Sequence, residues 1–352
     1  MTEDGIRNFV DRPRAVRRGV HIAASLVILL LAGSSFAATP TTGPANRSFR
    51  FTYAATITGL TAQQHARVWL PMPPSNAQQQ VDVISQQLPV TPKVGQEQKY
   101  GNRVLYFEAN ADDHGEIPLR ITYRVTRHEC GESDLPDAAG LIDELWLQPD
   151  ALVPVGGRSL TLLEGKTLPT DSLQLARVLY DVVDDHMEYR KDKPGFGRGD
   201  ADWACDSGFG NCTDFHSLFI SLARANHIPA RFEMGFPIAP AGTKGPSPIA
   251  GYHCWAWCKP AAHAWVPVDI SEANKHPDRR NYFFGHLDAD RVAFSIGRDL
   301  TLVPPQDGPP LNYFAYPYVE VDRKPHPLEK IMRHFESEEI TPVATIPENK
   351  NG

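Results

Sequence analysis

The sequence predicts an α+β fold in which an antiparallel β-sandwich with a connecting segment, over residues 46–165, precedes a helix-and-sheet domain over residues 166–323. In the first half, apolar and polar residues alternate within several short segments, and this period of two is typical of half-buried strands. In the second half, apolar residues three and four positions apart indicate an amphipathic helix, and strand-like segments follow it. A length of 352 residues with 41% hydrophobic content suits about two domains.

The first 37 residues are typical of an export signal. Five arginines outweigh three acidic residues ahead of an apolar run from Val20 to Ala32, and Ser35 and Ala37 supply small residues for cleavage. The run is shorter than the roughly 20 residues that span a bilayer, so no stable membrane span is expected. We therefore expect a periplasmic or secreted protein.

Four strands are expected in the β-rich half. The clearest is the alternation of Phe49, Phe51, Tyr53, Ala55 and Ile57. Further strands are expected at 66–70, 103–108 and 119–125, with a turn at 100–102. Residues 131–165 form a less regular connection.

The second half begins with a helix that Asp171 caps, ending near Met187. A loop rich in Gly, Asp and Lys follows, and a second helix begins near Cys212. This helix is expected to bury Phe215, Leu218, Phe219, Leu222 and Ala223.

Strand-like segments follow the second helix. We expect a strand at 230–236, a hairpin over 252–269 and a proline-rich strand-like segment at 301–321. Residues 324–352 are predicted to be a flexible tail, in which 328–335 could form a short helix.

Cys212 is the candidate nucleophile, because a glycine-rich turn delivers it to the start of a helix. A thiol attacks a carbonyl as the thiolate, and a helix N-terminus favours that charge. Lowering a thiol pKa from about 8.5 to about 4 requires roughly 6 kcal/mol, of which a helix terminus supplies at most about 2 kcal/mol. The remainder must come from a nearby imidazolium. The alternative, a buried structural cysteine, is disfavoured by the polar neighbours Asn211, Thr213 and Asp214.

His253 is the candidate base and Asp269 the candidate orienting acid. If the hairpin loop covers 259–263, His253 lies directly opposite Asp269, close enough for the carboxylate to hold one ring nitrogen. Pro267 cannot donate to the ladder, so a bulge could shift this register. His216, four residues after Cys212, is a rival base, and Asp269 could instead be a turn or capping residue.

The oxyanion would be stabilised by backbone N–H groups at the helix start, with Trp203 or Tyr189 as candidate side-chain donors. Trp255, Trp257 and Trp265 are expected on the His253 face of the hairpin. These tryptophans could line a tunnel for the acyl group, although packing of their rings across neighbouring strands is the simpler interpretation.

The other cysteines, Cys130, Cys205, Cys254 and Cys258, could form up to two disulfides in an oxidising compartment, and at least one is expected. Cys254 and Cys258 would be about 13 Å apart on one strand, too far to bridge. A Cys205–Cys212 disulfide would fit a loop but would leave Cys212 without the free thiol that a nucleophile requires. The spacings do not match the usual zinc ligand sets, so no metal or cofactor is expected.

These motifs together resemble the transglutaminase-like superfamily, whose core is papain-like. The resemblance is carried by residues 203–216, by 228–237, by Tyr252-His253-Cys-Trp-Ala and by Val266-Pro-Val-Asp269, and it covers about 166–320. It implies a helix bearing the cysteine packed on an antiparallel sheet, and a triad of Cys212, His253 and Asp269. Thr213 follows the cysteine where crosslinking animal enzymes have Trp, which weakens an expectation of glutamine–lysine crosslinking.

The expected function is cysteine-dependent acyl transfer on peptide or carboxamide bonds through a thioester, resolved by water as in a protease or amidase. Three alternatives remain: amine crosslinking of the transglutaminase type, a non-catalytic cell-envelope binding module, and a zinc hydrolase using His216, His253 and cysteines. The expected partner is a peptide or protein in the cell envelope. A net charge of −7 argues against nucleic acid.

Overall fold

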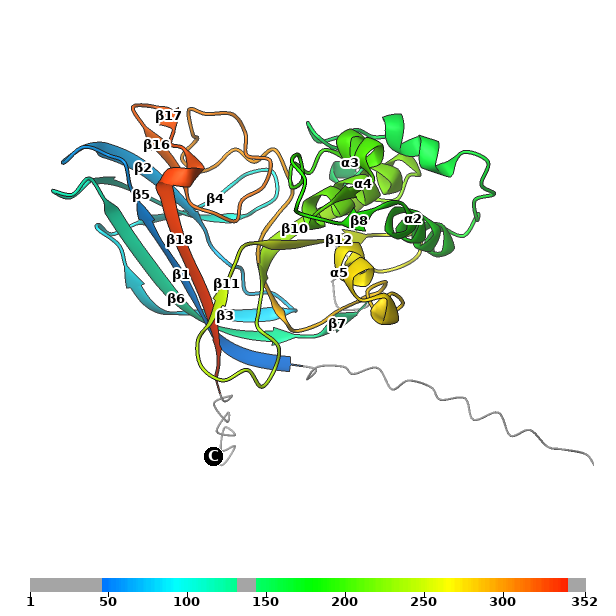
Figure 1. Cartoon of the computed structure of the whole chain (residues 1–352), viewed down its shortest axis with the longest axis horizontal. Coiled ribbons are helices and arrows are strands. Elements are labelled where there is room, and N and C mark those ends of the chain that lie inside the picture. The colour runs from blue at the N-terminus through cyan, green and yellow to red at the C-terminus, as the bar shows by residue number, and fades with distance from the viewer. Residues whose placement is uncertain (1–45, 132–143, 341–352) are drawn as a thin grey trace, which may run out of the picture. The chain divides into compact units, whose positions relative to one another are not determined.

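The computed structural model describes residues 46–131 and 144–340. The predicted signal peptide at 1–37 lies outside the described residues, as do 132–143 of the connecting segment and 341–352 of the predicted tail. Within the described ranges, the main sheets are two five-stranded sheets and one four-stranded sheet. Helices pack against the four-stranded sheet (Figure 1).

The first sheet has the order β11-β18-β1-β6-β3 and is antiparallel throughout. Its strands are β11 Ser247–Ile249, β18 Ile331–Glu339, β1 Asn46–Ile57, β6 Ile117–His128 and β3 Gln79–Gln87. The alternation predicted for β1 is confirmed, because the side chains of Phe49, Phe51, Tyr53, Ala55 and Ile57 are all buried.

The second sheet has the order β17-β16-β2-β5-β4 and is also antiparallel. Its strands are β17 Lys324–Pro325, β16 Tyr318–Val321, β2 His65–Pro71, β5 Arg103–Asn110 and β4 Lys93–Gln96. Apolar residues of β2 and β5 share one hydrophobic core with those of β1 and β6. The strands predicted at 66–70, 103–108 and 119–125 are therefore confirmed.

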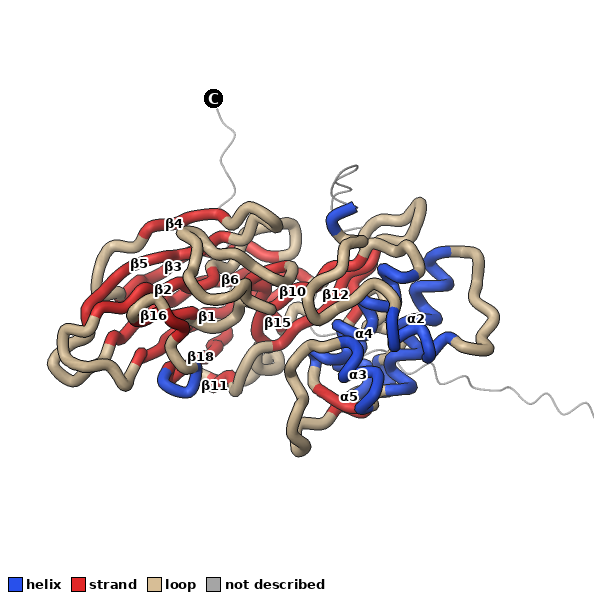
Figure 2. Tube along the Cα trace, turned by 90° about the horizontal axis from the view of Figure 1, so that it is seen from above, coloured by secondary structure: helices blue, strands red, loops and turns tan. Residues whose placement is uncertain are grey.

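The third sheet, in the order β13-β12-β10-β15, supports the candidate site. Its strands are β13 Val266–Val268, β12 His253–Cys258, β10 Ala230–Pro237 and β15 Arg291–Ile296. The helices gather beside it in Figure 2, and they are α2 Ser172–His186, α3 Ala201–Ser207, α4 Cys212–Ala225 and α5 Ile270–Lys275. Two short two-stranded sheets are also present: β8 Glu188–Tyr189 pairs with β9 Phe209–Gly210, and β7 Cys130–Gly131 pairs with β14 His286–Leu287. The 3₁₀ helices are η1 Gly157–Leu163, η2 Pro277–Arg279 and η3 Leu328–Lys330.

Both predicted helices form where the sequence places them. Asp171 caps α2 by accepting a hydrogen bond from the Gln174 backbone N–H. In α4, the predicted apolar face is fully buried, and this face packs on β10 and β12.

The prediction of a flexible tail from residue 324 is wrong for 324–340. Strand β18 pairs along most of β1, so segments from the two ends of the described chain lie side by side (Figure 1). Ile331 and Phe335 are four residues apart, a spacing that suits a helix face as well as alternate positions of a strand. The three residues between them, Met332, Arg333 and His334, are exposed. The segment at 301–321 is a strand only over Tyr318–Val321.

An aromatic cluster joins the third sheet to the first. The ring of Phe236 on β10 lies 5.3 Å from Phe51 and 4.7 Å from Phe335, and Phe294 on β15 lies 5.7 Å from Tyr53. Because these rings belong to one core, the strand that carries Phe335 stabilises the platform of the site as well as the first sheet.

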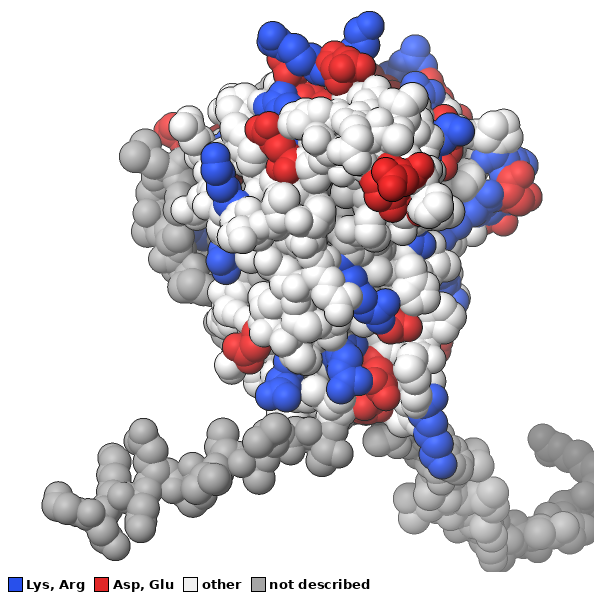
Figure 3. Space-filling view, turned by 90° about the vertical axis from the view of Figure 1, so that its left-hand side faces the viewer, with Lys and Arg blue, Asp and Glu red and all other residues white. Residues whose placement is uncertain are grey.

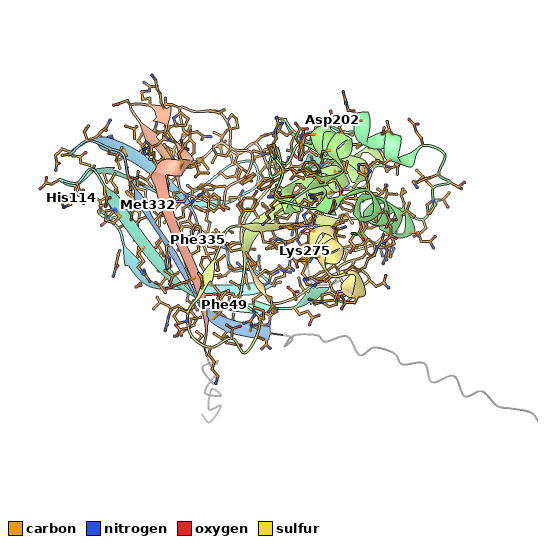
Figure 4. All side chains as sticks on the ribbon, in the orientation of Figure 1. Phe49, His114, Asp202, Lys275, Met332 and Phe335 are labelled. Carbon is orange, nitrogen blue, oxygen red and sulfur yellow. The ribbon has the colours of Figure 1, made fainter. Side chains whose placement is uncertain are left out.

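Replacing Phe335 by alanine is expected to lower the free energy of unfolding by about 3–5 kcal/mol, the usual cost of removing a buried phenyl ring. Phe335 is 3% exposed, whereas Met332 on the same strand is 57% exposed (Figure 4). Met332→Ala is therefore the matched control and should change stability by less than about 0.5 kcal/mol. Urea titration followed by circular dichroism measures both values. If neither variant changed the free energy of unfolding, β18 would not be part of the core.

On the face shown in Figure 3, basic and acidic side chains are interspersed and neither sign dominates. Within residues 46–131 and 144–340, no helix has the length and apolar character needed to cross a bilayer.

Candidate active site

The first component of the site is Cys212, the first residue of α4. Asn211 caps this helix through the Thr213 backbone N–H, and the Asp214 carboxylate accepts from the Asn211 backbone N–H at 2.9 Å, which completes a capping box. The thiol is therefore held at the positive end of the helix dipole. Cys212 is 2% exposed.

Asp214 also organises the loop before α3, a role that the sequence analysis did not identify. Its carboxylate accepts backbone N–H groups from Gly197 at 2.6 Å and from Gly199 at 2.9 Å. A Cβ atom at Gly210 would lie 2.5 Å from the Asp214 side chain, so this position admits only glycine. The glycine-rich turn is thus required to let the acid approach the backbone beside the thiol.

The hairpin brings His253 and Asp269 together through a register different from the predicted one. Cys258 pairs with Val266 and not with Ala264, so the loop is two residues longer than expected and His253 is not directly opposite Asp269. The shift is an even number of residues, so it leaves both side chains on the same face. His253 Nε2 lies 2.7 Å from Asp269 Oδ2.

The thiol of Cys212 and the ring of His253 are close enough for each to shift the pKa of the other. Since Nε2 is engaged by Asp269, Nδ1 is the ring nitrogen left for the sulfur. Burial alone would lower the pKa of His253, but Asp269 and the thiolate outweigh it and raise the pKa to about 10. Burial would likewise raise the pKa of Cys212, yet hydrogen bonds from Cys254 and His253 and the charge of His253 hold it well below its usual value. These opposite shifts favour a thiolate–imidazolium pair at neutral pH.

Asp269 is fully buried and serves two purposes. It caps α5, because Oδ1 accepts the Glu272 backbone N–H at 3.1 Å and the Ser271 hydroxyl at 2.9 Å. Its other oxygen, Oδ2, accepts a hydrogen bond from Arg291 Nη1 at 2.8 Å as well as facing His253. Burial would raise the pKa of Asp269, but His253 and Arg291 hold it well below its usual range. The capping and orienting interpretations of Asp269 are therefore compatible.

Arg291 is a site residue that sequence reasoning missed. It lies on β15, is 2% exposed, and also pairs with Asp288 through Nη2 at 3.0 Å. Its guanidinium lies 4.9 Å from the ring of Trp255. No local motif marks it, since its partner Asp269 is 22 residues earlier in the chain and on another element.

The rival base His216 is oriented away from this role. Its Nδ1 lies 2.7 Å from the Cys212 carbonyl oxygen, to which it must donate, and its Nε2 accepts the Ile270 backbone N–H at 3.1 Å. Both ring nitrogens are thus committed to backbone groups, and burial lowers the pKa of His216. A neutral ring in this position ties the start of α4 to the start of α5.

This geometry predicts different effects of the two histidines on turnover. His253→Ala should lower kcat/KM by about 10²–10⁴, the usual contribution of a general acid–base. His216→Gln should lower it by less than about tenfold, because the lost contacts position the backbone and transfer no proton. Steady-state kinetics on both purified variants measure the ratio. The reverse order of effects would make His216 the base.

The two predicted oxyanion donors lie in different surroundings. Burial and then the charge of Cys212 raise the pKa of the Tyr189 phenol, whose ring lies 6.1 Å from that of Phe215 on α4. Trp203 on α3 packs edge-on to Phe209 at 5.3 Å and against the backbone of Gly195. The tryptophans of β12 do not flank the sulfur as an acyl tunnel would require, because Trp255 and Trp257 belong to a separate core cluster with Trp265.

Tyr252 is a further neighbour that the sequence analysis did not single out. Its hydroxyl accepts a hydrogen bond from Asn211 Nδ2 at 3.1 Å, and its ring lies 5.2 Å from that of Tyr313. Burial, Tyr313 and Cys212 raise the pKa of its phenol, which therefore stays protonated. The sequence feature that points to Tyr252 is its position directly before His253.

The expectation of at least one disulfide is wrong, because the cysteines of the described residues form none. Cys205, Cys212 and Cys254 are free thiols, so the Cys205–Cys212 bridge is excluded and the four remaining cysteines do not form two bridges. The Cys254 sulfur lies 3.7 Å from His216 Nδ1 in the buried layer beside α4.

Among the residues that the structure describes, one group of side chains could hold a metal ion. His253, Asp269 and Glu272 each offer an atom within 4.8 Å of the others. In the structure the two carboxylates pair with neighbouring cations: Asp269 with Arg291, and Glu272 with Lys275. Lys275 is labelled at the end of α5 in Figure 4.

Comparison with known families agrees with this arrangement. Residues 162–270 match the family model of the transglutaminase-like superfamily, and the match contains Cys212, His253 and Asp269. This chain contains a transglutaminase-like superfamily domain. The observed topology, with the cysteine-bearing helix packed on an antiparallel sheet, is the one expected of that fold.

The transglutaminase-like chain is similar to several other proteins. An uncharacterised protein of Haemophilus influenzae is 32% identical over 186 residues, which cover 44% of this chain and half of that relative. A candidate cysteine protease from Cytophaga hutchinsonii is 14% identical, with 83% of this chain and 98% of that chain covered and a TM-score of 0.47. The periplasmic domain of TgpA from Pseudomonas aeruginosa is 16% identical, with 67% and 90% covered and a TM-score of 0.36.

Proposed function

We propose that this protein is a cysteine-dependent acyl-transfer enzyme that hydrolyses peptide or carboxamide bonds through a thioester on Cys212. The observation that carries the proposal is the buried pair of His253 and Asp269, with Nε2 of the ring 2.7 Å from the carboxylate, beside a Cys212 thiol whose pKa the charge of His253 lowers. Nucleophile, base and orienting acid in this order are the components of covalent acyl transfer.

In the acylation step, the thiolate attacks the carbonyl carbon and forms a C–S bond. The imidazolium of His253 donates its proton to the departing nitrogen as the C–N bond breaks, which releases an amine and leaves a thioester. The backbone N–H of Cys212 at the start of α4 is available to the oxyanion, and Tyr189, whose phenol senses the charge of Cys212, is the favoured side-chain candidate. Asp269 keeps the ring oriented and stabilises its positive charge.

In the second step, neutral His253 takes a proton from water, whose oxygen attacks the thioester. The C–S bond breaks, a carboxylic acid leaves, and the thiolate–imidazolium pair is restored. We favour water over an amine because hydrolysis requires no second binding site, and because Thr213 replaces the Trp that follows the cysteine in crosslinking relatives. An exported protein of this kind would act on peptides or proteins of the cell envelope.

Intact-mass spectrometry tests the proposal. The full chain is incubated with a library of peptides and carboxamides, quenched in acid, and searched for a mass increase equal to the acyl group. The proposal predicts an adduct on Cys212 that decays in water, and the same decay products when a primary amine is added. An amine-linked product in place of the acid would instead establish crosslinking. No adduct and no turnover across the library, with a folded protein, would favour a binding module.

A further inference from the structure

A cavity lies on the face of the third sheet that turns away from α4. Arg231 and Glu233 line it from β10, and since they are two residues apart they share one face, with Trp257 and Trp255 opposite them on β12. The intervening Phe232 belongs instead to the core cluster that includes α4. The cavity has a volume of about 410 Å³, within the usual range for small-molecule sites.

Glu233 presents a carboxylate oxygen to this cavity. The residue is 5% exposed, and its Oε2 accepts the indole N–H groups of Trp255 at 2.6 Å and Trp257 at 2.5 Å. Its other oxygen, Oε1, receives no hydrogen bond from the described part of the chain and is not among the fully buried polar atoms that lack a partner. Oε1 is therefore an acceptor that is open to a molecule in the cavity.

Arg231 supplies the opposite charge. Its guanidinium is stacked on indole rings, 5.2 Å from Trp257 and 5.1 Å from Trp265. Its Nε is buried without a hydrogen-bond partner, and within 46–131 and 144–340 it forms no ion pair with any carboxylate, Glu233 included. The ring contacts fix the position of the cation but leave its donors unused.

A partly or fully buried charge is normally paired or hydrogen-bonded, because leaving it unsatisfied is costly. Here a carboxylate and a guanidinium face one cavity without reaching each other. A simple anion would be repelled by Glu233, and a simple cation by Arg231. A molecule that carries both charges satisfies both groups at once.

We propose that this cavity binds a small zwitterion, a free amino acid or dipeptide, with its ammonium group on Glu233 Oε1 and its carboxylate on Arg231. The apolar wall formed by Met72, Phe294 and Ile296 would receive the ligand's side chain. The site also communicates with the candidate active site, because Glu233 holds Trp255, whose ring lies 5.9 Å from that of His253. Binding requires no acyl transfer, so the proposal is independent of the proposed function.

The test uses the full chain carrying Cys212→Ala, which removes any contribution of the thiol. Isothermal titration calorimetry and tryptophan fluorescence follow the addition of L-phenylalanine and of the dipeptide Ala-Phe. N-acetyl-L-phenylalanine lacks the ammonium charge, and L-phenylalaninamide lacks the carboxylate. The titrations are repeated with Glu233→Gln, with Arg231→Met, which keeps the contact with the indoles, and with Arg120→Gln, an exposed arginine of the first sheet, as control.

The expected result is saturable binding of one or both zwitterions, weakened at least about tenfold by each blocked derivative and by each cavity variant, and unchanged in Arg120→Gln. If Glu233→Gln fails to fold by circular dichroism, Arg231→Met decides the matter. Absence of binding at millimolar concentrations would mean that the cavity holds water only. Equal binding of the blocked derivatives, or binding unaffected by the cavity variants, would also overturn the proposal.

Discussion

Replacing Cys212 by alanine is expected to abolish turnover, with a fall of about 10⁶ in kcat of the order seen when a covalent nucleophile is removed. The reason is chemical: Cys212 is the thiol at the start of α4 that His253 and Asp269 serve, and His216 is bound to backbone atoms at both nitrogens. Steady-state hydrolysis of a substrate identified by the trapping experiment measures the loss.

Cys254→Ala is the matched control for that variant. Cys254 is a second buried thiol beside the site, and its hydrogen bond helps to keep the pKa of Cys212 low. Its removal should leave the enzyme active and reduce kcat by about 10- to 100-fold, the equivalent of the about 1.5–3 kcal/mol of one hydrogen bond to a charged group. Equal loss of activity in both variants would contradict the assignment of Cys212 as the sole nucleophile.

Asp269→Asn is expected to damage both stability and catalysis. Asp269 is fully buried between His253 and Arg291, so the amide leaves a buried guanidinium with one partner fewer, at a cost of about 3–5 kcal/mol in the free energy of unfolding. Because the pKa of Asp269 is held well below its usual range, this stabilisation is complete at neutral pH and is lost only as the pH falls through that low value. The loss of an orienting acid should also reduce kcat by about 10⁴.

Asp288→Asn separates the two effects. Asp288 pairs with the same guanidinium through Arg291 Nη2 at 3.0 Å and through Nε at 3.2 Å, and neither it nor its hydrogen bonds reach His253. The variant should therefore lose stability and keep most of its activity, measured by urea titration and by steady-state kinetics. If Asp288→Asn lost as much activity as Asp269→Asn at equal stability, Asp269 would act through the fold and not through the histidine.

The helix start and its cysteine could be predicted because their determinants are local. Asn211 and Asp214 lie within three residues of Cys212, and the capping box they form needs no tertiary information. The contact between His253 and Asp269 could also be predicted, although the register proposed for it was wrong by two residues. A register error of two residues does not change which face a side chain occupies, because side chains alternate with a period of two. His253 and Asp269 therefore stay on the same face.

The parts that could not be predicted depend on contacts between distant segments. Arg291 has no sequence pattern around it that points to Asp269, and only the pairing of β10 with β15 brings its strand beside the site. Strand β18 is similar: Ile331 and Phe335 fit a helix face as well as a strand, and only the exposed edge of β1 decides between them. Local patterns thus specify the elements, whereas pairing partners are set by the whole core.

The most direct test of the central claim is the rate of alkylation of Cys212 by iodoacetamide as a function of pH, measured by intact mass. Since the pKa of Cys212 lies well below its usual value and that of His253 is raised to about 10, the thiolate–imidazolium pair should persist between the two values. We expect a rate that is already high at neutral pH, changes little up to about pH 9, and changes again as His253 loses its proton near pH 10. A single rise centred near about pH 8.5, as for an ordinary thiol, would contradict this expectation.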